Sequence, residues 1–309
     1  MPFTLSHAAA VLPAVRRDGT GRGPLRPAAL IAGSFAPDMT FYAASVLPEG
    51  MEFGSVTHSF AGVFTVDVLI SWALVGLWLL VREPLLALLP RVRQGRPAAL
   101  LRCGAPHARA GAVSVVWWHV SAALGALTHV GWDAFTHDGR WGTRLIPAIE
   151  RDRLAGLPLF SWLQYGSSVV GAVLIVVFAA RAVRRAPGGE PVGVPVLSVR
   201  DRWLAGAVIG GCAAAGAGQR AARLMELRRE AAPARAAAGD GWASVDAPGR
   251  LWDLVPTLCF GAGAGLVLGL LLYAACVRVW RPGRVPDGPG GCGDPHGVVG
   301  ADPERPVAR

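Results

Sequence analysis

The sequence predicts an all-α integral membrane protein, a helical bundle of about six transmembrane helices. Two observations lead to this fold class. Of the 309 residues, 52% are apolar and only 17% are charged, whereas soluble domains carry roughly a quarter charged residues. The apolar residues also form long blocks, such as Phe60 to Val81, close to the roughly 20 residues that a helix needs to cross a bilayer. Such blocks are too long for the strands of a soluble core.

Six apolar blocks are expected to span the membrane: Ala28 to Leu47, Phe60 to Val81, Ala112 to Phe135, Ser161 to Ala180, Trp203 to Gly218 and Leu251 to Val277. The fifth block is the weakest, because it is short and rich in Gly and Ala. Arginines precede the first block and follow the second, fourth and sixth, so the positive-inside rule places both termini in the cytoplasm. Arginines in the expected outside loops, 137–160 and 219–250, count against this orientation.

The chain divides into four parts. Residues 1–180 hold the polar motifs, 181–200 form a cytoplasmic linker, 201–281 supply two further spans with an Arg/Ala-rich loop, and 282–309 are rich in Pro and Gly. The last part cannot bury enough apolar area to become ordered. The formal charge of +9 does not indicate nucleic acid as a partner, because the arginines lie between apolar blocks and not on one amphipathic face. The expected partner is the lipid bilayer of the cell membrane, in a multi-pass arrangement.

Ionisable side chains within apolar blocks are the main functional signal, because they are costly in lipid. In ALTHVGWDAFTHDG, the residues His129, Asp133 and His137 stand four residues apart. This spacing places His129 and Asp133 on one helix face, with His137 near it. An imidazole and a carboxylate on one face suit a single divalent metal ion. The alternative is a hydrogen bond between the two that satisfies a polar helix end.

Three further residues favour the metal site. Asp38 lies near the middle of the first block, where an unpaired carboxylate is strongly disfavoured, and Pro37 before it predicts a kink. His58 opens the second block and should lie at the outer end beside the 129–137 motif. His7, in the short apolar segment TLSHAAAVL, reaches this end only if its segment re-enters the membrane or the orientation is inverted. Gln164, at the start of the fourth block, either binds a polar substrate or joins helices together.

The motifs PFTLSHAAAVLP, GSFAPD, THSFAGVF, GALTHVGWDAFTH and LQYGSS, in this order, resemble an uncharacterised bacterial multi-pass membrane family, the domain of unknown function 4184. The resemblance covers roughly residues 1–180. That family is similar in motif order to inner-membrane metal-dependent hydrolases and, more distantly, to zinc-dependent phospholipase C. The resemblance implies the metal ligands His7, Asp38, His58, His129 and Asp133, with His137 and Gln164 facing the substrate or orienting the ligands.

Two positions depart from the family pattern. Thr40 and Tyr165 stand where members often carry an acidic residue and a histidine, which argues against a second metal ion. The expected cofactor is one divalent metal ion, with zinc as the first choice.

Two functions follow from these residues. The first is a membrane-embedded metal-dependent hydrolase of phosphoester or lipid-like substrates, with Asp38 or His137 as general base. The second is a non-enzymatic multi-pass protein, a transporter or a scaffold, whose polar cluster forms a proton or ion pathway.

Overall fold

The computed structural model describes residues 3–47, 49–103, 111–189, 191, 193–237 and 248–280, with the backbone alone for 231–237 and 248–253. Four helices in this part of the chain are long and apolar enough to cross a membrane: α6 (Val66–Ala87), α8 (Ala112–Thr136), α11 (Leu159–Arg185) and Leu254–Trp280 of α13 (Pro248–Trp280). The predicted class, an α-helical membrane bundle, is confirmed. The tail 282–309 lies outside the described residues.

Shorter helices and one small hairpin connect these spans. They are η1 (Thr4–His7), α1 (Ala8–Val11), η2 (Leu12–Ala14), α2 (Pro27–Phe35), η3 (Ala36–Asp38), α3 (Met39–Ala43), α4 (Gly50–Thr57), α5 (Phe60–Phe64), η4 (Arg91–Arg93), α7 (Gly95–Arg102), α9 (Trp141–Leu145), α10 (Ala148–Arg151), the antiparallel strands β1 (Arg153–Leu154) and β2 (Leu157–Pro158), and α12 (Val199–Ala237).

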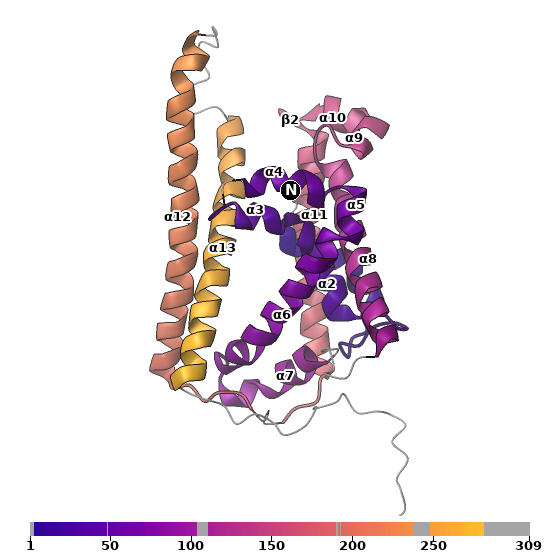
Figure 1. Cartoon of the computed structure of the whole chain (residues 1–309), viewed down its shortest axis with the longest axis vertical. Coiled ribbons are helices and arrows are strands. Elements are labelled where there is room, and N and C mark those ends of the chain that lie inside the picture. The colour runs from indigo at the N-terminus through magenta and orange to yellow at the C-terminus, as the bar shows by residue number, and fades with distance from the viewer. Residues whose placement is uncertain are drawn as a thin grey trace, which may run out of the picture.

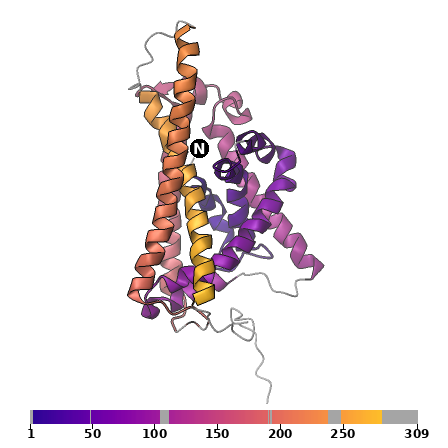
Figure 2. The same cartoon turned by 60° about the vertical axis from the view of Figure 1, so that its left-hand side comes forward.

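The expected count of about six spans is not confirmed, and two blocks account for the difference. The first block breaks into α2, η3 and α3 around Pro37, because proline lacks an N–H donor and its ring clashes with the preceding turn. The fifth block lies in α12, a long helix whose many Gly, Ala and Arg residues make it less apolar than the other four. α12 packs lengthwise against α13, as both views show (Figures 1 and 2).

The N-terminal segment lies among the membrane helices. η1 and α1 contact α11 and α2, and the backbone N–H of Phe3 donates to the Ser168 hydroxyl of α11 over 3.1 Å. In Figure 1 the N-terminus is marked in the middle of the bundle, beside α3 and α11. His7 therefore enters the interior from a segment that spans nothing itself, and the choice between a re-entrant segment and an inverted orientation stays a prediction.

Several arginine-bearing connections lie at one end of the bundle, whereas the arginines of α9 and α10 lie at the other end (Figure 1). α7 lies at the first of these ends together with the C-terminal ends of α11 and α13 and the start of α12 (Figure 1). Within it, Arg102 donates to Glu83 at 2.6 Å, and Arg82 donates to the same carboxylate at 3.0 Å. The cytoplasmic location of this end stays a prediction.

Two glycines let α2 lie directly against α8. A Cβ atom at Gly33 would collide with the carbonyl oxygen of Ala122, and one at Gly125 would collide with that of Leu30. Small residues at such crossings let helix backbones approach closely in lipid. This contact sets Ser34 and the turn after it against the middle of α8, where the polar cluster lies.

Gly125→Ala is therefore expected to destabilise the protein and to lower its metal content. Gly131→Ala on the same helix meets open space, so it should gain only the helix propensity of alanine, about 1 kcal/mol. Thermal unfolding and metal analysis of both variants in detergent test this pair. Equal behaviour of the two variants would show that the α2–α8 contact does not support the site.

Candidate metal centre

Four buried side chains converge between η3, α4 and α8. Asp38, His58, His129 and Asp133 each offer one nitrogen or oxygen atom, and these atoms all lie within 4.8 Å of one another. Asp38 and His129 are fully buried, and Asp133 and His58 are 3% and 8% exposed. We call these four residues the His/Asp cluster. A group of this composition and burial is able to bind a metal ion.

Local breaks in the helices deliver two of the four residues. The turn at Pro37 ends with Asp38, so its carboxylate points into the bundle from a helix junction and not from a helix face. His58 follows α4 as its C-terminal cap. His129 and Asp133 are one helical turn apart on α8, as their spacing predicts.

Backbone carbonyls fix the direction of both imidazoles. His129 Nδ1 donates to the Ser34 carbonyl at 2.8 Å, and His58 Nδ1 donates to the Gly54 carbonyl at 3.0 Å. A carbonyl only accepts hydrogen bonds, so the proton of each neutral ring is on Nδ1 and the lone pair is on Nε2. Both Nε2 atoms face the cluster, in the arrangement that orients metal-binding histidines.

Asp38 is oriented in the same way. The Thr4 hydroxyl donates to its Oδ2 atom at 2.5 Å, whereas Oδ1 has no hydrogen-bond partner although it is buried. His129 Nε2 is likewise buried without a partner. Buried polar atoms normally have partners, so these atoms fit a ligand that the four side chains share.

The separations in the cluster distinguish shared ligation from direct hydrogen bonds. His129 Nε2 is 3.5 Å from Asp38 Oδ1 and 3.5 Å from Asp133 Oδ2, and His58 Nε2 is 3.8 and 3.6 Å from the same two oxygens. Hydrogen bonds of this type are about 2.7–3.2 Å long. Four ligands about 2.1 Å from a common centre in a tetrahedron lie about 3.4 Å apart. These four separations are close to the second value, and the other two are within 4.8 Å.

Charge leads to the same interpretation. Asp38 and Asp133 bring two carboxylates into an interior with little water, where unpaired charges are strongly disfavoured. A divalent cation held by the cluster would balance the charge of the two carboxylates.

Two further histidines lie beside Asp133. His7 Nε2 is 3.4 Å from Asp133 Oδ1, and its ring stacks on His129 with 3.7 Å between centroids. His137 Nδ1 is 3.1 Å from the Asp133 carbonyl oxygen, and its Nε2 atom is buried without a partner. Burial lowers the pKa of His137, and burial and the nearby His129 lower the pKa of His7 to about 3. Both rings therefore keep a free lone pair at neutral pH.

Gln164 is less directly placed. It is buried on α11, and its backbone carbonyl accepts the Ser168 hydroxyl at 2.7 Å. Within the described part of the chain no hydrogen bond joins its side chain to the cluster. The predicted role of Gln164 near the substrate stays a prediction.

Sequence reasoning missed Thr4, whereas for Asp67 it predicted burial and a structural hydrogen bond, with orientation of a metal ligand as the alternative. The Thr4 hydroxyl donates to Asp38. Thr4 precedes His7 by three positions, about one helical turn, and this spacing could have indicated that both side chains face the same site. Asp67 in the first turn of α6 is fully buried, and neither carboxylate oxygen has a hydrogen-bond partner among the described residues. Its position near the positive end of the helix dipole offsets part of this cost.

Comparison with known proteins places the chain in a family. No curated protein and no solved structure matches it. The model of the family described as Domain of unknown function (DUF4184) matches residues 1–275, well beyond the 1–180 over which the motifs resemble that family. The match therefore includes α12 and most of α13, and the chain belongs to this family.

Proposed function

We propose that this protein is a membrane-embedded metal-dependent hydrolase of phosphoester or lipid-like substrates. The observation that carries the proposal is the His/Asp cluster, with Nε2 atoms and carboxylate oxygens set 3.5–3.8 Å apart around one point inside a membrane bundle. A divalent ion held there polarises a phosphoryl or carbonyl oxygen and makes bound water acidic enough to react at neutral pH.

Each residue has a distinct part in this proposal. Asp38, His58, His129 and Asp133 hold the ion, and His7 supplies a weaker fifth ligand beside Asp133 Oδ1. His137 is the general base, because its Nε2 atom is free and its ring is half-buried at the outer end of α8. Two nitrogen and two carboxylate ligands suit zinc and also manganese or iron, and we propose zinc as the first ion to test.

The substrate must be reached from the lipid or from the outer end of the bundle. His137 lies four residues after Asp133 and directly follows Thr136, the last residue of α8, before the loop to α9. The cluster itself lies about 4–10 Å inside this end, at 1.5 Å per helical residue. A group at the membrane interface, such as a lipid ester or phosphoester, lies at that depth.

Restoration of hydrolysis by metal tests the function. The protein, purified in detergent and stripped with a chelator, is expected to hydrolyse bis(4-nitrophenyl) phosphate or dioctanoyl phosphatidic acid only after addition of zinc or manganese. His58→Ala should lose this activity together with the ion. His119→Ala is the matched control, since His119 is exposed on α8.

Two results would contradict the proposal. If the purified protein held no transition metal before stripping and bound none afterwards, the cluster would not be a metal centre. If the protein bound metal but hydrolysed neither substrate class, the result would favour the alternative function, a proton or ion pathway. Proton or cation flux in liposomes would then be the next measurement.

A further inference from the structure

A second feature of the bundle adjoins the His/Asp cluster without belonging to it. A pocket of about 260 Å³ lies between the N-terminal segment, α3, α11 and α13. Its volume is just below the roughly 300–1,000 Å³ of ordinary ligand sites. The lining residues are Phe3, Thr4, Leu5, Tyr42, Tyr165, Val255, Pro256, Cys259, Phe260, Ala262 and Gly263.

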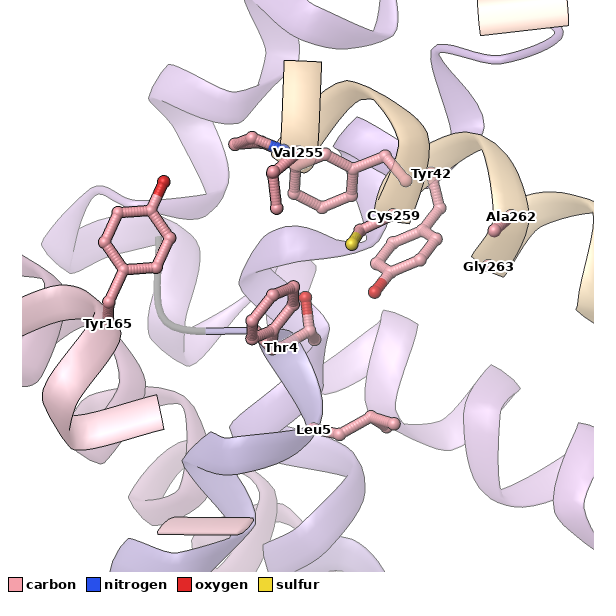
Figure 3. A pocket seen from close by; sticks show the side chains of 11 residues that line it. Thr4, Leu5, Tyr42, Tyr165, Val255, Cys259, Ala262 and Gly263 are labelled. Carbon is pink, nitrogen blue, oxygen red and sulfur yellow. The ribbon is translucent and has the colours of Figure 1, made fainter. Parts of the chain in front are cut away.

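The pocket is apolar along its walls and polar at one end. α13 contributes side chains such as Val255 and Phe260 to one wall, and Leu5 lies opposite (Figure 3). Thr4 and Tyr42 supply the hydroxyl groups at this end, and Tyr165 lies across the pocket from Tyr42 (Figure 3). In Figure 3 the Tyr42 hydroxyl and the Cys259 thiol both point towards Thr4.

Thr4 joins the pocket to the metal centre. Its hydroxyl donates to Asp38 Oδ2 at 2.5 Å, so one side chain separates the polar end of the pocket from a cluster oxygen. Phe3 and Leu5, on either side of Thr4 in the chain, are 44% and 66% exposed. They lie beside α11 and α13, which are long and apolar enough to cross a membrane, so in a bilayer these exposed apolar side chains would face lipid.

We propose that this pocket binds the acyl chain of a phospholipid and so defines the substrate of the cluster as an acyl-bearing phosphoester. The inference rests on the proposed function for the reaction, although binding of the chain does not need it. An acyl chain matches the apolar walls, and it is the apolar group in highest concentration in a bilayer. The same chain would bring its polar headgroup to Thr4 and Asp38, whereas a water-soluble phosphoester gains nothing from these walls.

Photocrosslinking in nanodiscs tests the pocket directly. The probe is a phospholipid with a diazirine on one acyl chain, and the readout is the lipid adduct at each residue, assigned by fragmentation of the peptides in the mass spectrometer. Adducts are expected at Tyr42, which is partly buried behind α13. Adducts at Leu268, which is exposed on α13, report ordinary contact with bilayer lipid and serve as the internal reference.

Cys259→Trp should fill the pocket and abolish the Tyr42 adduct while the Leu268 adduct and the metal content persist. Cys276→Trp is the matched control on the same helix, because Cys276 is an exposed free cysteine; it should leave both adducts unchanged. Ala262→Phe fills the pocket from a neighbouring position and repeats the test if Cys259→Trp fails to fold.

The outcomes separate the two proposals. A metal-loaded wild-type protein without a Tyr42 adduct, or a Tyr42 adduct that survives both filling variants, overturns the acyl-chain pocket and leaves the hydrolase standing. A Tyr42 adduct that disappears in the filled variants of a protein without metal supports the pocket and removes the hydrolase.

Discussion

Asp133→Asn is expected to empty the metal centre and to destabilise the fold. Asp133 Oδ2 lies 3.5 Å from His129 Nε2 and 3.6 Å from both His58 Nε2 and His137 Nδ1, and Oδ1 faces His7. The amide keeps the shape but removes one of the two negative charges that balance the ion. Loss of a direct ligand should exceed the roughly 10–100-fold loss of affinity seen when only an outer partner is removed.

The measurements are metal content per purified chain and thermal unfolding with and without a chelator. Wild-type protein should lose stability when the chelator is added, whereas Asp133→Asn should start at the lower value and not respond, because metal binding is coupled to folding. Asp152→Asn, at an exposed position, is the control for the charge change. Full metal content in Asp133→Asn would make the His/Asp cluster a structural hydrogen-bonded group.

His137→Ala is expected to keep the metal ion and lose the reaction. Its Nδ1 atom approaches the Asp133 carbonyl at 3.1 Å, and Nε2 is free, so the ring is held in place without being needed by the four ligand atoms. Removal of a general base lowers turnover by about 10²–10⁴-fold.

The informative measurement is the ratio of turnover to metal content in the same preparation. A parallel loss of metal and turnover would place His137 among the ligands and not among the groups that act on substrate. Unchanged turnover with full metal content would leave the role of general base to Asp38.

Features that depend on one or two helical turns could be predicted from the sequence, whereas features that depend on distant contacts could not. The kink at Pro37 and the shared face of His129 and Asp133 follow from proline geometry and helical periodicity, which operate over one or two turns. The number of membrane-spanning helices does not follow from such local rules, because an apolar block looks continuous in the sequence whether or not its helix is broken. The N-terminal segment is a different case, since its position depends on contacts with α2 and α11 that no short stretch encodes.

The packing of the helices explains why the sequence alone could not decide how His7 reaches the cluster. Its place beside Asp133 requires α2 to lie against α8, and that closeness depends on Gly33 and Gly125. A glycine in a membrane helix is compatible with many arrangements, so the sequence alone left the side of the membrane undecided. Thr4 was missed for a related reason, because a hydroxyl near a terminus has many possible partners.

The anchoring of the N-terminal segment fixes the order in which the site can be completed during synthesis. The Phe3 N–H donates to the hydroxyl of Ser168, which is 165 residues later in the chain. His7 can contact Asp133 only after α8 has been synthesised. Chains grow at roughly 5–20 residues per second, so the segment leaves the ribosome many seconds before its binding partners. The N-terminal segment is therefore anchored only after α11 has been made, and a nascent chain arrested before that helix would lack the bond between Phe3 and Ser168.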